Sequence, residues 1–167
     1  MSALLQFNAA SAPQREPMTV ADLDAVLGIE NLVYEFPWTR GNFIDSLAAG
    51  YAAQVLRRAD GELCAYCVTM TGVQEMHLLN LSVAPAWQHR GLGRGLLDAL
   101  AADCRAADAL WLWLEVRESN RRAREIYRQY GFEQVGWRRS YYPAVAGRRE
   151  DACVLRLPTG GSRDALD

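Results

Sequence analysis

The chain has 167 residues, of which 50% are apolar and 23% are charged, and its formal net charge is −2. Such a length and composition are typical of one globular domain with a substantial core. The acidic balance disfavours direct binding to nucleic acid, because proteins with that function usually carry a basic surplus. The apolar runs stay below the roughly 18 residues of a membrane span, so we expect no membrane contact.

Residues 1–17 lack the basic start and long apolar stretch of a signal peptide, and we predict that they form a flexible N-terminal extension. A flexible C-terminal tail is predicted for 158–167, which is rich in glycine and serine. The folded domain is therefore expected to span 18–157.

The four cysteines indicate a reducing compartment rather than a disulfide framework, and we expect a cytoplasmic protein. Cys64 and Cys67 form a Cys-x-x-Cys pair, a spacing that can be redox-active or bind zinc. They lie inside a predicted strand, where residues three apart point to opposite faces. No second pair supplies further ligands at zinc spacing. We therefore expect core cysteines and no metal site.

Two helices are predicted in the first part of the domain. Thr19 is a typical N-cap residue, and inward positions follow it at helical spacing. These positions are Leu23, Val26, Leu27 and Glu30. Phe36-Pro37-Trp38 interrupts the helix, and Thr39 caps a second one that runs to about residue 49. Its apolar side is predicted to hold Phe43, Ile44 and Leu47.

Strands are predicted next, at 51–58, 63–71 and 75–83. Ala59-Asp60-Gly61 joins the first two as a hairpin turn, and Ala84-Pro85 ends the third. A glycine-containing loop then leads into a helix over 93–107. Its apolar stripe consists of Leu96, Leu97, Leu100, Ala101 and Cys104.

The last part of the domain alternates strands and helices. The segment 109–116 is apolar on both faces, which predicts a central buried strand. A helix over 120–130 would turn Ala123, Ile126, Tyr127 and Tyr130 inward and Arg121, Arg122, Arg124 and Arg128 outward, and Gly131 ends it. Strands at 133–142 and 151–157 finish the domain. The order of elements predicts an α/β (α+β) fold, a mixed sheet with helices on both faces.

The most informative stretch is the loop Gln88-His89-Arg90-Gly91-Leu92-Gly93-Arg94. Two glycines one residue apart let the backbone approach a ligand closely. The unpaired N–H groups at the start of the following helix attract anions, above all phosphate. A P-loop would need Lys-Ser/Thr here, and a dinucleotide fingerprint would need a third glycine where Leu96 stands. The stretch is either a cradle for pyrophosphate or a plain turn before a helix.

Two side chains are candidates for acid–base chemistry. Glu115 lies on a mainly apolar strand, where a carboxylate is costly unless it has a purpose or a partner. It is either a general base or a residue at the strand's end that reaches solvent or pairs with Arg117. Tyr127, on the inward side of its helix, is either a proton donor or a core aromatic residue.

Three further groups of residues are candidates for ligand binding or catalysis. Asn120 is either a helix cap or a hydrogen-bonding group for a cofactor. If the sheet opens beside Leu81-Ser82-Val83, the free backbone groups there would pair with an extended amide-bearing ligand, as another strand would. His77 and His89 are weaker candidates for a base, because one sits amid apolar residues and the other in the phosphate loop.

The loop pattern Gln/Arg-x-x-Gly-x-Gly/Ala resembles the acyl-CoA loop of the GNAT N-acetyltransferase superfamily. Four further motifs carry a closer resemblance: Phe36-Pro37-Trp38, Leu112-Trp113-Leu114-Glu115-Val116-Arg117-x-Ser119-Asn120, Tyr127-x-x-x-Gly131-Phe132 and Arg138-Arg139-x-Tyr141-Tyr142-Pro143. Together they resemble the bacterial ribosomal-protein-alanine N-acetyltransferases, the RimI group, from about Met18 to Leu157. The chain departs from that pattern in its longer N-terminal extension and in His89, where an arginine is usual.

The resemblance implies a GNAT fold, with a mostly antiparallel sheet of six or seven strands that is splayed at an acetyl-CoA site. It implies that Glu115 accepts a proton and that Tyr127 donates one. Acetyl-CoA would be held by Leu81, Ser82, Val83, Gln88, His89, Arg90, Gly91, Leu92, Gly93, Arg94 and Asn120. If Phe36 and Trp38 face Tyr141 and Tyr142 across the opening, they form an aromatic slot for an extended N-terminal peptide.

We therefore predict an enzyme that transfers acetyl from acetyl-CoA to the α-amine of a protein N-terminus, with the N-terminal alanine of a ribosomal protein as the expected target. One alternative is an acetyltransferase that acts on a lysine or a small free amine. Another is a CoA-binding module without turnover. The presence of both Glu115 and Tyr127 disfavours this last class, because a module without turnover has no need of either group.

Overall fold

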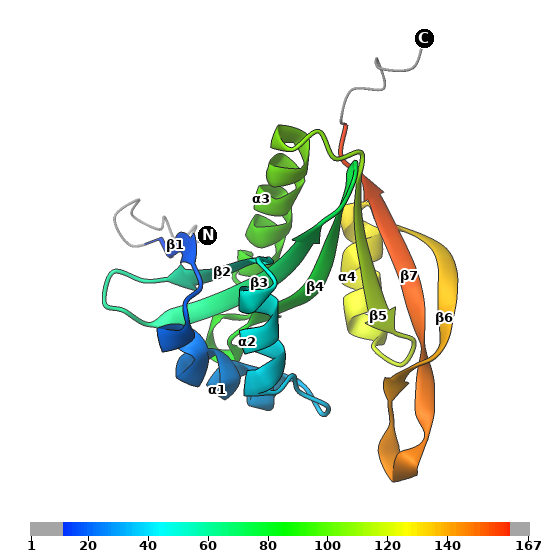
Figure 1. Cartoon of the computed structure of the whole chain (residues 1–167), viewed down its shortest axis with the longest axis horizontal. Coiled ribbons are helices and arrows are strands. Elements are labelled where there is room, and N and C mark those ends of the chain that lie inside the picture. Colours follow the sequence, from blue (N-terminus) through cyan, green and yellow to red (C-terminus); the bar gives the residue numbers. More distant parts are fainter. Residues whose placement is uncertain (1–11, 161–167) are drawn as a thin grey trace, which may run out of the picture.

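The structure is a computed structural model that describes residues 12–160. These residues form one seven-stranded sheet in the order β1-β2-β3-β4-β5-β7-β6 (Figure 1). Only β4 and β5 are parallel among its neighbouring strands. The strands are β1 (Gln14–Pro17), β2 (Ala52–Arg57), β3 (Leu63–Thr71), β4 (Glu75–Val83), β5 (Trp111–Arg117), β6 (Glu133–Pro143) and β7 (Arg149–Pro158). The predicted mixed, mostly antiparallel sheet is confirmed.

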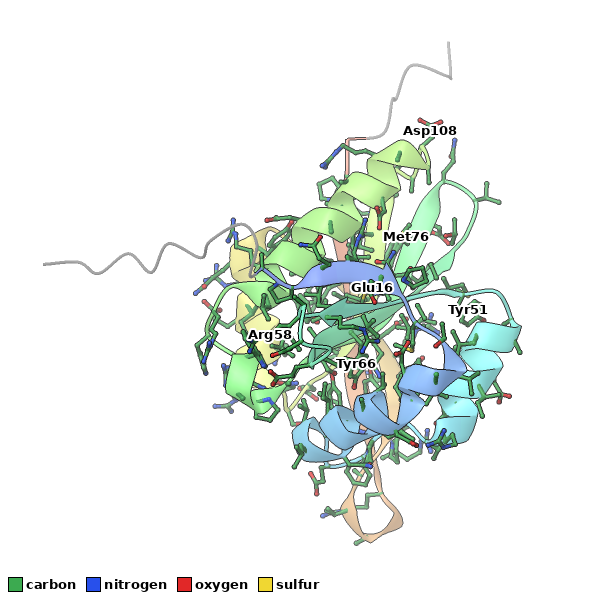
Figure 2. The ribbon with its side chains drawn as sticks, turned by 90° about the vertical axis from the view of Figure 1, so that its left-hand side faces the viewer. Glu16, Tyr51, Arg58, Tyr66, Met76 and Asp108 are labelled. Atoms are coloured by element: carbon green, nitrogen blue, oxygen red, sulfur yellow. The ribbon has the colours of Figure 1, made fainter. Side chains whose placement is uncertain are left out.

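Helices cover both faces of this sheet (Figure 1). They are α1 (Leu23–Val33), α2 (Arg40–Ala48), α3 (Leu92–Ala106) and α4 (Arg121–Tyr130), with short 3-10 helices at Val20–Asp22, Pro85–Trp87 and Val145–Gly147. The core on one face joins α1 and α2 to β2 and β3. The core on the other face joins α3 and α4 to the middle strands. Figure 2 views the sheet from the β1 edge, with α3 on one side and α1 and α2 on the other.

Local signals in the sequence set several of these boundaries. Thr39 is the N-cap of α2, and its hydroxyl accepts a hydrogen bond from the N–H of Asn42 at 3.2 Å. Gly131 ends α4 with a φ of 123°, a conformation that favours glycine. Cys64 and Cys67 belong to the cores on opposite faces, and all four cysteines are free. These three predictions are confirmed.

Structured residues lie beyond both predicted limits of the domain, 18 and 157. The predicted extension includes Gln14–Pro17, yet these residues pair with β2 as an edge strand. Arg15 also forms an ion pair with Asp103 of α3 at 2.6 Å. Thr159, in the predicted tail, is only 3% exposed, and its hydroxyl donates to the carbonyl oxygen of Ala109 at 2.6 Å. Residues 1–11 and 161–167 lie outside the described residues.

Three predictions about buried faces were wrong. Ile44 and Ile126 are 40% and 48% exposed, because neighbouring positions on α2 and α4 face the sheet instead. On α2 the buried residues are Phe43 and Ser46, and the hydroxyl of Ser46 donates to the carbonyl oxygen of Asn42. Strand β5 is central, but only one of its faces is fully buried. Its other face carries half-buried Trp111 and Trp113, since the core formed by α1 and α2 contains no residue of β5.

Strand β4 separates from β5 halfway along its length. The two strands pair only from Glu75 opposite Trp111 to Leu78 opposite Leu114. The next residue, Leu79, is the extra residue of a bulge, because Leu78 and Asn80 face consecutive residues of β3. A bulge bends its strand and increases the local twist. It therefore accounts for the opening between β4 and β5, and it turns Asn80 toward α1.

Candidate active site

Glu115 is the first residue of β5 beyond the last pairing with β4, so it lies where the opening begins. Its side chain is 13% exposed. One carboxylate oxygen, Oε1, accepts a hydrogen bond from Arg138 Nε of β6 at 2.8 Å. The hydroxyl of Tyr142 donates to the backbone carbonyl of Glu115 at 3.1 Å. The sequence offered Arg117 as an ion-pair partner, but the partner in the structure is Arg138.

Tyr127 lies on the sheet-facing side of α4, half-buried and in edge contact with Phe132 at a centroid distance of 5.4 Å. Burial raises the pKa of its hydroxyl above the usual value, and the nearby phenols of Tyr34 and Tyr142 raise it further. Among the described residues, the hydroxyl makes no hydrogen bond. Tyr127 therefore keeps its proton at neutral pH and is free to donate it. The geometry is compatible with the predicted acid, although the ring also packs against the core, as the alternative interpretation held.

The glycine loop has the backbone geometry of an anion cradle. Gly91 is the N-cap of α3 with a φ of 81°, and His89 has a φ of 61°. The first helical hydrogen bond runs from the N–H of Gly95 to the carbonyl of Gly91. The N–H groups of the three residues between them are thus available to a ligand. A Cβ on Gly91 would meet no protein atom within 4 Å, so the space beside it is open.

Cationic side chains surround this loop. Arg90 stacks on Trp87 with its guanidinium carbon 4.7 Å from the ring centroid. Arg94 lies over the ring of Tyr130 at 5.4 Å. Arg122 lies on the exposed face of α4, as predicted, and its Nη2 lies 2.9 Å from Nε2 of His89. The guanidinium group of Arg122 therefore lies beside His89, the loop position at which the family pattern usually has an arginine.

Strand β4 presents backbone groups to the opening. The carbonyl of Leu81 accepts a hydrogen bond from the hydroxyl of Tyr34 at 2.9 Å, and that of Val83 accepts one from Gln88 Nε2 at 3.2 Å. Because a residue's N–H and C=O point to the same edge of a strand, the N–H groups of both residues face this edge too. Ser82 points instead into the protein, where it is 3% exposed. An extended ligand could therefore pair with this edge.

Asn120 serves as the N-cap of α4, and its Oδ1 accepts the N–H of Ala123 at 3.1 Å. This contact supports the cap interpretation. It engages the amide oxygen of the side chain, so the amide NH₂ group remains the part that a cofactor would contact.

Arg117 joins the two parts of the predicted aromatic slot. Its guanidinium carbon lies 4.8 Å from the ring centroid of Phe36 and 4.5 Å from that of Tyr142. Its Nη1 donates to the carbonyl of Pro143 and to Glu150, both at 2.7 Å. Phe36, in the loop between α1 and α2, and Tyr142 of β6 therefore meet at one cation. Tyr141 is exposed, contacts Tyr142 and lies beneath Arg138.

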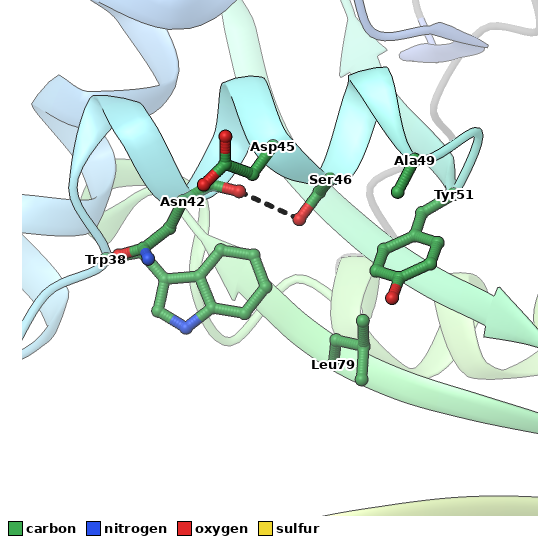
Figure 3. A pocket seen from close by; sticks show the side chains of 7 residues that line it. All are labelled: Trp38, Asn42, Asp45, Ser46, Ala49, Tyr51 and Leu79. Atoms are coloured by element: carbon green, nitrogen blue, oxygen red, sulfur yellow. Dashed lines mark hydrogen bonds between the residues drawn. The ribbon is translucent and has the colours of Figure 1, made fainter.

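Trp38 lies apart from that meeting point. Its ring packs against Phe43 and lines a hollow of about 450 Å³ between α2 and the bulge of β4 (Figure 3). The other lining residues are Asn42, Asp45, Ser46, Ala49, Tyr51 and Leu79. Phe36 and Trp38 thus contribute to different surfaces: Phe36 to the contact with Arg117 and Trp38 to this hollow.

Tyr34 is a residue of the opening that the sequence analysis did not single out. Its hydroxyl bonds both to the carbonyl of Leu81 and to the hydroxyl of Ser82, each at 2.9 Å. Burial raises its pKa to about 12, so it remains a hydrogen-bond donor. The only local signal is its position just before Phe36-Pro37-Trp38, because its partners lie more than 40 residues away in the chain.

Comparison with known proteins places this geometry in a family. The model of the acetyltransferase (GNAT) family matches residues 23–132. The chain therefore belongs to the GNAT acetyltransferase family, and the predicted resemblance is confirmed.

No helix within residues 12–160 is long and apolar enough to cross a membrane.

Several individual proteins of this family are similar to the chain over most of its length. The chain is 37% identical over 141 residues to the [ribosomal protein bS18]-alanine N-acetyltransferase of Salmonella typhimurium, which covers 84% of this chain and 94% of the relative. It is 31% identical over 139 residues to a putative enzyme of the same name from Bacillus subtilis, with 83% and 90% coverage. The crystal structure of the ribosomal-protein-S18-alanine N-acetyltransferase of Escherichia coli superposes with a TM-score of 0.81 and 34% identity, covering 92% and 98%.

Proposed function

We propose that the protein transfers the acetyl group of acetyl-CoA to the α-amine of a protein N-terminus, and that this N-terminus is the alanine of a ribosomal protein. The single observation that carries the proposal is the convergence at the opening between β4 and β5. A carboxylate, Glu115, stands at its start. The protonated phenol of Tyr127 projects from α4 near Tyr34 and Tyr142, which bond to the backbone of Leu81 and of Glu115. Few other reactions need both groups beside a free strand edge and an anion cradle.

In the proposed reaction the amine nitrogen attacks the thioester carbon, a C–N bond forms and the C–S bond breaks. The attacking amine must first lose a proton, because an ammonium has no lone pair. Glu115 accepts this proton, directly or through a water molecule. The departing sulfur takes up a proton from Tyr127, whose pKa is raised by burial. The second proton, which the nitrogen loses after attack, restores the phenol, and Glu115 returns its proton to solvent. The products are an acetylated N-terminus and CoA.

Three features would bind acetyl-CoA. The N–H groups at the start of α3 would bind the pyrophosphate, because a helix N-terminus carries a partial positive charge and unpaired donors. The edge of β4 at Leu81 and Val83 would pair with the amide-bearing pantetheine arm. The NH₂ group of Asn120 would supply a further hydrogen bond. His89, Arg90 and Arg94 would add contacts or charge beside the phosphates.

The proton chemistry favours an α-amine over a lysine as acceptor. The ordinary pKa is about 7.7–8.0 for an α-amine and about 10.4 for a lysine. This difference of about 2.5 units corresponds to roughly 3.4 kcal/mol of deprotonation free energy. One glutamate can therefore activate an N-terminus more readily. Phe36 and Tyr142, which meet at Arg117, would flank the extended peptide together with Tyr141, and we expect that only a small first side chain fits at the closed end.

Peptide mass spectrometry tests this proposal. The purified protein is incubated with acetyl-CoA and a short peptide that begins with alanine and contains an internal lysine. The matched control is the same peptide with a blocked N-terminus. We expect an acetyl group on the α-amine of the first peptide and much slower labelling of the control. Equal or faster labelling of the lysine would favour a lysine or small-amine acetyltransferase, and the absence of any turnover would favour a CoA-binding module.

A further inference from the structure

Glu30, in the last turn of α1, is a buried carboxylate that the proposed reaction does not use. It is 1% exposed, and each of its oxygens accepts hydrogen bonds. Oε1 accepts the backbone N–H of Trp38 at 2.8 Å. Oε2 accepts Asn80 Nδ2 at 3.1 Å and the hydroxyl of Tyr66. Burying a carboxyl group is costly unless partners of this kind replace water.

These contacts continue into the strand that faces the opening. The hydroxyl of Ser82 lies 3.3 Å from Asn80 Oδ1 and 2.9 Å from the hydroxyl of Tyr34. Tyr34 in turn donates to the carbonyl of Leu81 at 2.9 Å. A connected set of hydrogen-bonding groups therefore runs from the backbone of Trp38, through Glu30 and Asn80, to the backbone of β4. The single proton of Ser82 serves either Asn80 Oδ1 or the Tyr34 hydroxyl at one time. Tyr66 belongs to the same network, because its hydroxyl contacts the Glu30 carboxylate and also interacts with Ser82.

The two ends of this chain are the two surfaces that the proposed reaction must align. Trp38 belongs to the loop that carries Phe36, and Leu81 lies on the edge that would pair with acetyl-CoA. The bulge at Leu79 is what turns Asn80 toward Glu30, so the feature that opens the sheet also makes this connection. A core apolar side chain at position 30 would fill the space but would leave the N–H of Trp38 without its partner.

We propose that Glu30 is a positioning residue, which fixes the α1–α2 loop relative to the acetyl-CoA strand and thereby places the acceptor peptide for attack. This inference rests on the proposed function. It assigns Glu30 no contact with either substrate. Its effect is geometric, because a misplacement of about 1 Å at a reacting centre can reduce the rate about a hundredfold.

The test is steady-state kinetics of Glu30→Gln with the alanine peptide. Glutamine keeps the shape, but it presents an NH₂ group where the network needs an acceptor. We expect kcat/KM for the peptide to fall by about ten- to a hundredfold, with a raised peptide KM, while the KM for acetyl-CoA stays within about twofold. The matched control is Thr69→Val, which removes the buried hydrogen bond from the Thr69 hydroxyl of β3 to the carbonyl of Ala52 and touches no member of this chain. It should retain peptide kinetics close to those of the wild type.

Thermal unfolding of both variants separates positioning from loss of structure. A folded Glu30→Gln protein with wild-type peptide kinetics would overturn the proposal, as would equal losses in the two variants. If Glu30→Gln fails to fold, Asn80→Ser is measured instead, because Asn80 is the next residue of the chain after Glu30. An unchanged peptide KM in Asn80→Ser would also overturn the positioning role of Glu30. The wild type is measured first: no turnover of the α-amine would refute the proposed function, whereas the variants decide only the role of Glu30.

Discussion

The two sides of the opening are built in different ways. The cofactor side consists mainly of backbone: the left-handed Gly91, the free N–H groups of α3 and the edge of β4. The acceptor side consists of side chains from separate elements, which meet at Glu115 and Arg117. A backbone site tolerates changes in side-chain identity but not in backbone conformation. A site made of side chains loses its function when one of those side chains is replaced, even if the backbone keeps its conformation. The following predictions test this difference.

The largest effect is expected on the acceptor side, at Glu115. Glu115→Gln keeps the size and leaves an acceptor for Arg138, but it removes the base. We expect kcat with the alanine peptide to fall by about a hundredfold or more near pH 7, with little change in acetyl-CoA affinity. Arg138→Gln is the control for the ion pair. Because Arg138 is 53% exposed and only contacts the carboxylate, its loss should cost much less. Comparable losses in both variants would contradict the assignment of the base.

Tyr127→Phe should produce the next largest effect. The ring keeps its contact with Phe132, so the fold is retained, and only the donated proton is lost. We expect turnover to fall by about ten- to a hundredfold with acetyl-CoA affinity unchanged. Calorimetry gives the affinity and release of free CoA gives the turnover. Normal turnover would leave Tyr127 as a core aromatic residue.

On the cofactor side, Gly91→Val should weaken acetyl-CoA binding by about tenfold or more, because its branched side chain would enter the space that the pyrophosphate needs. It would also strain the backbone, since φ is 81°. Gly95→Ala is the control, because Gly95 lies within α3 and a Cβ there also meets no atom within 4 Å. Calorimetry should separate the two variants. An unchanged affinity in Gly91→Val would contradict the pyrophosphate cradle.

A moderate effect is expected from Arg117. Arg117→Lys keeps the charge but loses the planar group that contacts both Phe36 and Tyr142. Contacts of this kind contribute about 0.5–2 kcal/mol each, so the peptide KM should rise by about three- to tenfold. The KM for acetyl-CoA, measured in the same assays, should not change. A rise in that constant instead would place Arg117 on the cofactor side.

The smallest effect is expected from Arg122, which stands beside His89. Arg122→Ala should weaken acetyl-CoA binding by about two- to threefold at low salt, and by less at high salt, because exposed charges are screened. Arg121→Ala is the control, since Arg121 is also an exposed arginine of α4 but lines a surface hollow together with Phe132 and Glu133 instead. Equal effects in both variants would mean that only the net charge of α4 matters. A salt-independent loss would contradict the electrostatic role.

The difference between the backbone-built cofactor side and the acceptor side built from side chains also explains what could be predicted from the sequence. Strands β3 and β4 match their predicted ranges, and the loop before α3 has the left-handed Gly91 that its pattern favours. These features depend on alternation, caps and turns, which are local. The bulge at Leu79 and the pairing of β1 depend on partners far away in the chain, and the sequence analysis missed both.

The acceptor side shows this limit most clearly. The motifs contain Glu115, Phe36 and Tyr142 and also the arginines Arg117 and Arg138, but they do not indicate which groups these arginines connect. Arg138 and Arg117 lie 23 residues and 26 residues from the groups that they contact, Glu115 and Pro143. Paired arginines are common on surfaces, so their spacing carries no such information. Glu30 occupied an inward helical position in the sequence, but its partner Asn80 is 50 residues away.

The central claim is that the opening holds two separate proton transfers, one at Glu115 and one at Tyr127. The most direct test is the pH dependence of kcat/KM for the alanine peptide, from about pH 6.5 to 9, in the wild type, Glu115→Gln and Tyr127→Phe. The deficit of Glu115→Gln should shrink as the pH rises past about 7.7–8.0, because the amine is then already neutral. The deficit of Tyr127→Phe should stay constant, since burial raises the pKa of Tyr127 and keeps it protonated throughout. A constant deficit in Glu115→Gln would contradict the account.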